Sequence, residues 1–401
     1  MANNYIEQTD QERLEREQRK HRGLTVLLIV LLITALVCVA LYIIDRYRHK
    51  VYDSYEVVKQ VERTDSVAAV YIPYNGNSIL KYSRDGALAI DREGNILWNG
   101  SYDFNLPAAD TCGNYAVIAD IGGTKAVVFN GTDSGTEIEV LLPIVEARVA
   151  GQGVVALLLE DSTSNVLKIY NPYASDKELL VEIPTSVQED GFPIDFAISE
   201  DGTKVVTSFL NIKNGVQENY LNFYNFDEVG KNTVNRLVGA RNMEDQMVAK
   251  VEFLNNNTVC AFTENGFLLY DMKQIPSDLF TKEFKDNIKG VCYDKEHIAV
   301  ALGSLEEAGN TGIRIYDMEG NEVLNRKTGF QFDSMYLSDG ELVLYGNISW
   351  NVLRLDGTMK YEGDFESGIE KIFPVDNYET YIVMDSSKIN IIHMGGAGFD
   401  F

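Results

Sequence analysis

From about Asp65 onward the chain alternates short apolar segments with turns rich in Gly, Asp and Asn. One pattern recurs: an apolar segment, then Asp or Asn, then a turn and another apolar segment. Its eight copies begin at Leu88–Asp91, Val127–Asn130, Leu167–Asn171, Leu221–Asn225, Phe267–Asp271, Ile313–Asp317, Val352–Asp356 and Lys388–His393. A spacing of roughly 35–50 residues is typical of four-stranded propeller blades. The pattern therefore predicts an all-β protein, a β-propeller.

Asp-Gly pairs mark hairpin turns inside the repeat. They occur in Ser83–Gly86, Ser199–Thr203 and Leu337–Glu341, each between two apolar segments. Asp-Gly supplies the positive φ that tight hairpins require, so each copy is interpreted as strand, Asp-Gly hairpin, strand, loop, strand, turn, strand. The eighth copy lacks its outer strand, and Tyr55–Glu62 has the composition to complete it. We expect eight blades; seven blades, and a disordered juxtamembrane linker at Tyr55–Glu62, are the alternatives.

Leu24–Ile44 is a run of 21 residues without a formal charge. As a helix it spans about 32 Å, close to the thickness of the hydrocarbon core of a bilayer. The run therefore predicts one transmembrane helix, retained as a membrane anchor. Two alternatives stay open: a cleaved signal peptide, whose apolar region is normally shorter, and a lipoprotein with Cys38 as the lipidated residue, although Val37 precedes it.

The charges that flank this run predict its orientation. Three basic residues lie close to each end of the run, so the number of positive charges is nearly equal on its two sides. Arg13 and Arg16 favour an N-terminus in the cytoplasm and a propeller outside the cell. The domains that we expect are a cytoplasmic charged head at 1–23, a transmembrane helix at 24–44, a juxtamembrane linker at 45–54 and an extracytoplasmic propeller at 55–401.

The whole chain carries a net charge of −25, and because the head is neutral and residues 45–50 carry +2, the body from Val51 carries −27. Such a surface repels phosphate backbones and anionic headgroups, which argues against nucleic acid as a partner. Solubility explains the charge, and attraction of cations or basic partners is the alternative. The body's cysteines, Cys112, Cys260 and Cys292, are odd in number and widely spaced. We expect small core residues, not a disulfide framework; one disulfide is the alternative.

Ala89, Asp91, Gly94 and Trp98 follow the spacing Ala-x-Asp-x-x-Gly-x-x-x-Trp. This resembles the tryptophan-docking motif of quinoprotein-type (PQQ-like) propellers, with one residue missing from the turn. In that family the Trp packs against the neighbouring blade. The sixth copy has Asn325 at the equivalent position. The whole layout resembles an uncharacterised family of Gram-positive bacterial proteins with a short basic head, one membrane span and a quinoprotein-like propeller of unknown function. This resemblance implies an architecture and no activity.

The sequence carries no recognisable motif of an enzyme or a cofactor site. Quinoprotein dehydrogenases hold their cofactor beneath a disulfide between adjacent cysteines, and no two cysteines are neighbours here. No H-E-x-x-H or C-x-x-C spacing offers zinc ligands, and neither a G-x-S-x-G elbow nor a phosphate-binding loop occurs. Adjacent carboxylates, such as Glu200-Asp201, are expected by chance among 60 acidic residues. We predict no catalytic, cofactor-binding or metal-binding residues.

Two long links between second and third strands are the candidate binding sites. They are Asn211–Asn219 in the fourth copy and Ser304–Gly312 in the sixth. In propellers these links lie on the same face as the connections between blades, where partners commonly bind; a harmless insertion is the alternative. The candidate binding residues are Asn211, Lys213, Asn214, Glu306, Glu307 and Asn310.

These observations favour a membrane-anchored extracytoplasmic propeller that acts as a binding or scaffold module at the cell envelope. Its expected partners are the lipid bilayer, through Leu24–Ile44, and a protein or another component of the envelope. The alternative is an envelope-associated hydrolase or oxidoreductase with a pocket on a propeller face, which a cluster of carboxylates around a central pocket would favour. A sensor that signals through the span is a third hypothesis, for which the head of 23 residues offers no output domain.

Overall fold

The computed structural model describes residues 27–398 except 44, 47–48, 64–68, 92, 133, 175–177, 214, 245, 304–310 and 376–378. By its internal contacts the chain divides into two units. One comprises Met1–Tyr52 with Ala397–Phe401, and the other comprises Asp53–Gly396.

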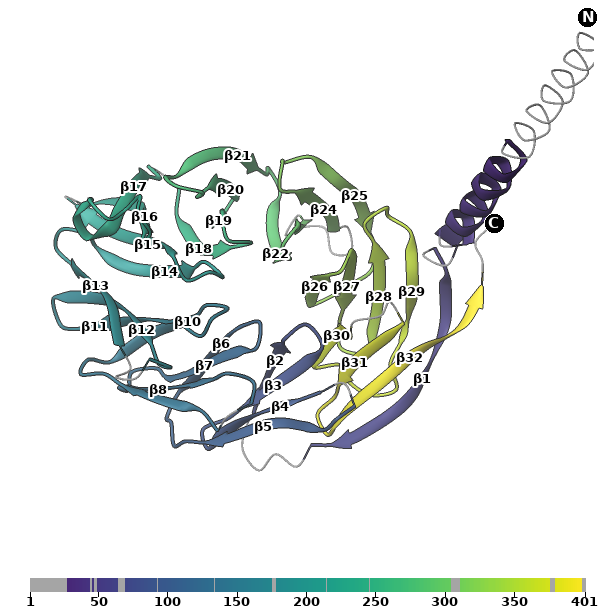
Figure 1. The fold of residues 1–401 in the computed structure, drawn as a ribbon, viewed down its shortest axis with the longest axis horizontal. Helices are drawn as coiled ribbons and strands as arrows, with labels where there is room; N and C mark the ends of the chain where they lie inside the picture. The colour runs from purple at the N-terminus through teal and green to yellow at the C-terminus, as the bar shows by residue number, and fades with distance from the viewer. Residues whose placement is uncertain are drawn as a thin grey trace, which may run out of the picture. The chain divides into compact units, whose positions relative to one another are not determined.

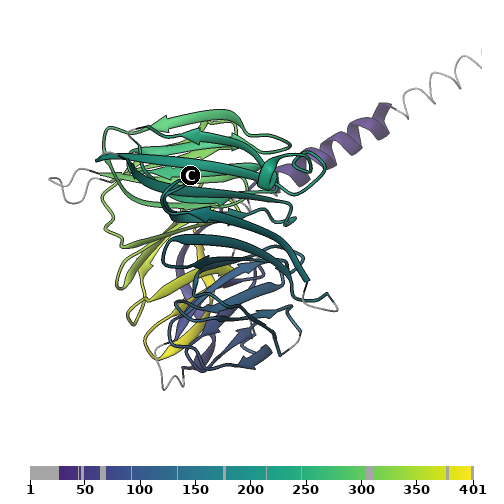
Figure 2. The same cartoon turned by 90° about the vertical axis from the view of Figure 1, so that its left-hand side faces the viewer.

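The unit Asp53–Gly396 is a ring of β-sheets (Figure 1, Figure 2). In the described residues, eight sheets of four strands each follow one another around the axis. Within each sheet, hydrogen-bonded neighbours are also neighbours in the chain, except at the closure of the ring. The innermost strands surround the axis in Figure 1: β2, β6, β10, β14, β18, β22, β26 and β30. The predicted eight-bladed propeller is confirmed.

The first four blades follow directly along the chain. Their strands are β2 (Val70–Tyr74), β3 (Ser78–Tyr82), β4 (Gly86–Ile90) and β5 (Ile96–Ser101); β6 (Pro107–Cys112), β7 (Tyr115–Asp120), β8 (Lys125–Phe129) and β9 (Thr136–Glu139); β10 (Ile144–Val149), β11 (Val155–Glu160), β12 (Ser164–Asn171) and β13 (Glu178–Ser186); and β14 (Phe192–Ile198), β15 (Lys204–Lys213), β16 (Val216–Asn225) and β17 (Leu237–Asn242). A single 3₁₀ turn, η1 (Val234–Arg236), precedes β17.

The remaining blades repeat the arrangement. Their strands are β18 (Val248–Phe253), β19 (Thr258–Thr263), β20 (Gly266–Asp271) and β21 (Ser277–Glu283); β22 (Asn287–Tyr293), β23 (His297–Gly303), β24 (Thr311–Asp317) and β25 (Glu322–Thr328); β26 (Ser334–Ser338), β27 (Glu341–Tyr345), β28 (Ser349–Arg354) and β29 (Met359–Asp364); and β30 (Lys371–Val375), β31 (Thr380–Met384), β32 (Lys388–Gly398) and β1 (Val51–Glu62).

The first strand of the chain closes the ring. The eighth sheet has the order β1-β32-β31-β30, so β1 supplies the outer strand that the last copy lacks. The closing strand predicted at Tyr55–Glu62 is confirmed; it begins at Val51, inside the stretch 45–54 expected as a linker. Directly after β1, the backbone N–H of Arg63 donates to the carbonyl of Ser387 at 2.7 Å, and its guanidinium pairs with Glu370 at 2.5 Å. β1 therefore covers the edge of β32, which would otherwise be the outer edge of the last blade.

The eight recurring segments are all third strands, from β4 to β32. The Asp-Gly turns are less uniform. Those at Gly202 and Gly340, with φ of +70° and +78°, join first and second strands as expected. The turn in Ser83–Gly86 instead joins the second strand β3 to the third strand β4, so its assignment as a first hairpin is wrong. In that blade Asn75 and Gly76, both with positive φ, make the first hairpin.

Apolar side chains pack between neighbouring blades. Trp98 of β5 stacks on Phe129 of β8, in the next blade, with 4.3 Å between ring centroids. The Trp98 Nε1–H donates to the Tyr74 hydroxyl at 3.2 Å. A Cβ atom at Gly100 would lie only 2.4 Å from Cε1 of Phe129, which explains the glycine there. The packing implied by the quinoprotein resemblance is confirmed.

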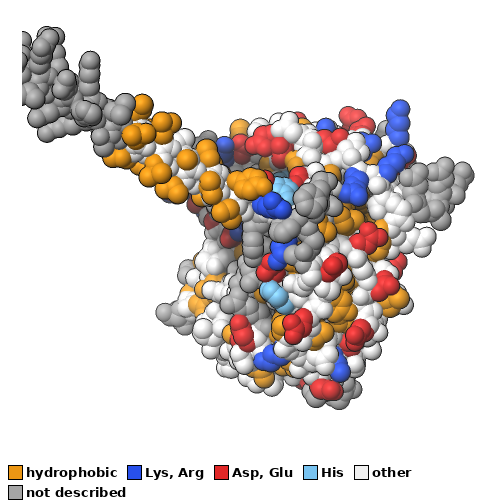
Figure 3. Space-filling model, turned by 90° about the vertical axis from the view of Figure 1, so that its right-hand side faces the viewer, with side chains coloured by type: hydrophobic (Ala, Val, Ile, Leu, Met, Phe, Trp, Pro, Cys, Tyr) orange, Lys and Arg blue, Asp and Glu red, His pale blue; other side chains and the backbone are white. Residues whose placement is uncertain are grey.

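The other unit contains a helix at residues 27–43, whose side chains are exposed and mostly apolar (Figure 3). Residues 24–26 and 44 of the expected span lie outside the described residues, as does the head at 1–23. Within the described part of the chain, no helix has both the length and the apolar character needed to cross a membrane.

Candidate functional site

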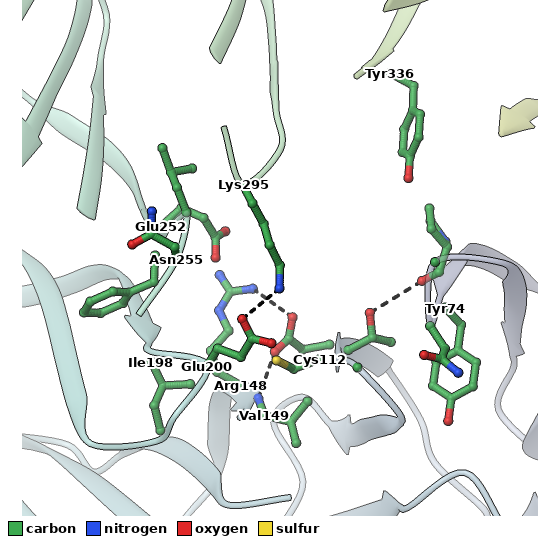
Figure 4. Close-up of a pocket in the computed structure, with 18 residues that line it drawn as sticks. Tyr74, Cys112, Arg148, Val149, Ile198, Glu200, Glu252, Asn255, Lys295 and Tyr336 are labelled. Atoms are coloured by element: carbon green, nitrogen blue, oxygen red, sulfur yellow. Dashed lines mark hydrogen bonds and ion pairs between the residues drawn. The ribbon is translucent and has the colours of Figure 1, made fainter. Parts of the chain in front are cut away.

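A cavity of about 540 Å³ lies at the end of the ring where the first strand of each blade turns into the second. Residues of seven blades line it, from one to four residues of each, and Figure 4 draws them as sticks. This size falls in the range of binding sites for small molecules. We call this cavity the axial mouth. Its wall includes Tyr74, Asp110, Cys112, Arg148, Glu200, Glu252 and Lys295.

Arg148 of β10, in this wall, is the centre of a group of charges, of which Glu146 and Asp195 do not line the cavity themselves. Its Nη2 lies 2.5 Å from Oε1 of Glu146 and 3.0 Å from Oδ1 of Asp195. Its Nη1 lies 3.8 Å from Oδ1 of Asp110, and its Nε–H donates to the carbonyl of Phe196 at 3.1 Å. One guanidinium therefore serves three carboxylates, which come from β6, β10 and β14.

Two of these carboxylates also tie neighbouring blades together. Asp110 of β6 accepts the backbone N–H of Val149 on β10 at 2.8 Å. Asp195 of β14 accepts the backbone N–H of Val251 on β18 at 2.8 Å. The pairing register shifts just before Glu146 and just before Asp195, and such bulges change the direction of the side chains that follow. The cluster therefore fixes the innermost strands relative to one another.

Burial changes the protonation of this cluster. It raises the pKa of Asp110 to about 6 and also raises the pKa of Glu146, although Arg148 opposes both shifts. Burial alone would lower the pKa of Arg148, but the surrounding carboxylates outweigh it and raise that pKa. The native protein therefore favours the protonated form of Glu146 more than the unfolded chain does. Shifted pKa values of this kind often mark functional sites.

An ion pair crosses the axial mouth. Lys295, in the first hairpin of blade 6, places its Nζ 2.8 Å from Oε2 of Glu200, in the first hairpin of blade 4 (Figure 4). The side chains are 71% and 42% exposed, so the pair adds little stability. Cys112 lines the same cavity. Burial, together with the negative charges of Glu200 and Asp110, raises the pKa of its thiol to about 12, which leaves it protonated and poorly nucleophilic near neutral pH.

Glu252 of β18 completes the acidic wall. It accepts the hydroxyl of Tyr293 at 2.7 Å, and the Lys250 ammonium donates to the same hydroxyl at 2.6 Å. Burial, and then the charge of Glu252, raises the pKa of Tyr293. In the described part of the chain, no group of three or more His, Cys, Asp or Glu residues is arranged to hold a metal ion.

The loop expected at Asn211–Asn219 is instead a long hairpin. Pairing between β15 and β16 continues as far as Lys213 and Val216, so the expectation of a loop is wrong. Strand-forming residues such as Ile212 and Val216 favour the extension, because the β-branched side chain fits a pleated strand. Only 214–215 remain as the connection, and Asn214 lies outside the described residues.

The two described candidate residues have local partners. Asn211 is buried, and its Nδ2 donates to the carbonyl of Glu189, in the link that precedes β14, at 3.0 Å. The hairpin therefore lies on the face of the blade links, away from the axial mouth. Lys213 places its Nζ 3.9 Å from Oε2 of Glu218. The other candidates, Glu306, Glu307 and Asn310, lie outside the described residues.

Sequence reasoning missed the charges of the axial mouth, although a signal for them existed. The innermost strands of four consecutive blades each contain a charge among small or apolar residues: Asp110 in PAADTC, Arg148 in IVEARV, Asp195 in FPIDFAI and Glu252 in VAKVEF. Charged side chains are rarely buried unless they are paired. Four such strands in succession indicate a shared charged site once their place at the axis is known.

Residues 48–394 match the model of a family described as a family of unknown function (DUF5711). No curated protein matches the sequence. The fold is similar to that of BamB from Moraxella catarrhalis, with a TM-score of 0.53, 9% identity and coverage of 85% of this chain and 100% of that chain. It is also similar to Saccharomyces cerevisiae Sqt1, with a TM-score of 0.54, 14% identity and coverage of 85% and 99%. At these identities the likeness concerns the fold alone.

Proposed function

Because the chain belongs to the DUF5711 family, whose function is unknown, we propose its role from the geometry of the ring: it is a binding or scaffold module that holds a partner at the axial mouth. The observation that carries this proposal is the cavity of about 540 Å³ with charged groups in its wall. Asp110 and Asp195 hold their strands through hydrogen bonds between blades. A site fixed in this way loses little conformational entropy when it binds.

The charges of the axial mouth favour a basic segment as the partner. Carboxylates of Asp110, Glu200 and Glu252 line it together with Arg148 and Lys295, and the whole chain carries −25. Lys295 already places an ammonium group on Glu200. A lysine or arginine of the partner would replace Lys295 there at small cost, because the pair that it breaks is exposed. Complementary charge also speeds association and excludes acidic partners.

A photo-crosslinking amino acid in place of Lys295 tests this binding in intact cells. Lys273 is the matched control, because it is also an exposed lysine, with 75% of its side chain accessible, and it follows β20 in blade 5. We expect a discrete adduct with one partner from position 295 and none from position 273. The same adducts from both positions, or none from position 295, would refute binding at the axial mouth.

We further propose that the ring works outside the cytoplasmic membrane, tethered through Leu24–Ile44. The 21 uncharged residues of that run support the tether, and Arg13 and Arg16 support a cytoplasmic N-terminus. Protease treatment of intact cells tests both points. We expect the ring to be digested while a tag on residues 1–23 survives; digestion of the tag with survival of the ring would reverse the orientation.

One observation favours a second candidate function, an envelope-associated enzyme that uses acid–base chemistry. Burial raises the pKa of Glu146 and raises the pKa of Asp110 to about 6, and neighbouring carboxyl groups with raised pKa values are a feature that hydrolases exploit. Against it, Asp110 and Asp195 each accept a backbone N–H, and Glu252 accepts the Tyr293 hydroxyl. The variant Glu146→Gln separates the two functions, because it would abolish turnover by an enzyme and leave the crosslink from position 295 intact in a binding module.

A further inference from the structure

A second cavity, of about 590 Å³, lies on the other face of the ring, among blades 6, 7 and 8. Its wall includes the start of β22, the link between β25 and β26, and the start of β30. We call it the aromatic cavity, because five rings line it: Phe330, Phe332, Tyr336, Tyr345 and Phe373. The rings of Tyr336 and Phe373 meet edge to face, with centroids 5.8 Å apart.

Two lysines give this cavity a charge opposite to that of the chain. Lys289 of β22 and Lys371 of β30 both line it and are exposed. Among the described residues neither ammonium group forms an ion pair, and Asp333 is the one carboxylate residue in the described lining. In a chain with a net charge of −25, a cavity with two unpaired lysines and one carboxylate is a distinct place for an anion.

The five aromatic side chains supply the apolar part of a binding site. Aromatic rings offer flat apolar surfaces for the body of a ligand. A mostly apolar wall with a few polar groups is the usual composition of a small-molecule site, and the volume lies within the usual range.

We propose that the aromatic cavity binds a small anion built on a ring, whose carboxylate or phosphate contacts Lys289 and Lys371 and whose ring lies against Phe332 and its neighbours. This proposal does not rest on partner binding at the axial mouth. The two cavities are neighbours, because Pro73 and Tyr336 line both of them. The ligand is either an aromatic acid or a sugar that carries a carboxylate or a phosphate. Each of these compounds carries an anionic group on a flat or compact ring.

Saturation-transfer NMR and titration calorimetry on the full chain test the proposal. The probes are phenyl phosphate and benzoate for an aromatic body, and glucose 1-phosphate and glucuronate for a sugar. Phenol, glucose and inorganic phosphate are the matched compounds that lack the anion or the ring. We expect at least one ring-bearing anion to bind about tenfold or more tightly than its matched compounds, as loss of a charge-assisted contact predicts. Whichever class of probe binds more tightly, the aromatic anions or the sugar anions, identifies the ring of the ligand.

Variants locate the binding. Lys289→Gln and Lys371→Gln should each raise the dissociation constant of the anion about tenfold. Each should also make the affinity depend less on salt concentration. Lys285→Gln is the matched control, because Lys285 is exposed in the link before β22 and does not line the cavity. The proposal is overturned if no ring-bearing anion binds the wild type, if neutral rings or inorganic phosphate bind as tightly, or if Lys285→Gln weakens binding as much as Lys371→Gln. Thermal unfolding confirms that each variant is folded.

Discussion

Replacing Glu146 with Gln tests the electrostatics of the axial mouth. Burial raises the pKa of Glu146 above its ordinary value of about 4.5, so as pH rises past that value the native state keeps a proton that the unfolded chain releases. Stability falls as pH rises wherever the native state binds more protons than the unfolded state. The wild type should therefore lose stability between pH 5 and pH 8. The Gln variant, which mimics the protonated carboxyl group, should lose less.

The magnitude follows from the linkage between protons and folding. One differential proton changes the free energy of unfolding by about 1.4 kcal/mol for each pH unit, so three units give at most about 4 kcal/mol. Asp110, whose pKa is raised to about 6, contributes to the wild type and the variant alike and largely cancels in their difference. Urea unfolding followed by circular dichroism at pH 5, 6, 7 and 8 measures that difference.

A surface carboxylate provides the control. Glu228→Gln removes a side chain that is 86% exposed and pairs with Lys231 at 3.1 Å, so its effect should not change with pH over this range. If the Glu146→Gln variant instead becomes less stable than the wild type as pH rises, Glu146 is ionised and paired with Arg148 in the native state. That result, or a difference that does not change with pH, would refute the reasoning.

Three further predictions concern the ring itself, each measured by urea unfolding or size-exclusion chromatography. Trp98→Ala should cost about 3–5 kcal/mol through the lost stack on Phe129, and Trp98→Phe about 1 kcal/mol through the lost hydrogen bond; equal costs would contradict this. Lys360→Met should cost about 3–5 kcal/mol, because it leaves Glu341, now 2.5 Å from the ammonium, buried without its charged partner; the double variant with Glu341→Leu should recover most of the loss. Deleting Val51–Glu62 should expose the edge of β32 and produce oligomers; a monomer with wild-type stability would refute the role of β1.

The fold was predictable because each blade repeats a local pattern. The third strands carry the same apolar segment and turn, and the segment at Tyr55–Glu62 had the composition of the missing strand. Local patterns failed where pairing decides the outcome. Nothing in Asn211–Asn219 taken alone shows that β15 and β16 pair as far as Lys213 and Val216. Likewise, an Asp-Gly pair indicates a hairpin but not which two strands it joins.

The axial mouth was harder to predict because its residues meet only through the closure of the ring. Asp110, Arg148, Asp195 and Glu252 come from four different blades. Each one alone resembles the many other charges of an acidic chain. Their register shifts, burial and raised pKa values depend on long-range packing that a single sequence does not specify. A cluster of carboxylates around a central pocket is the feature that, by the sequence reasoning, would favour an enzyme. Such a cluster is present, but Asp110 accepts a backbone N–H and Glu252 accepts the Tyr293 hydroxyl.

Crosslinking from both faces of the ring in the same cells tests most directly whether the partner is held at the axial mouth. One variant carries the photo-crosslinker at Lys295. The other carries it at Ile212, whose side chain is 68% exposed on the hairpin of the opposite face. We predict a partner adduct from position 295 and none from position 212. An adduct from position 212 alone, or adducts of equal yield from both positions, would contradict binding at the axial mouth.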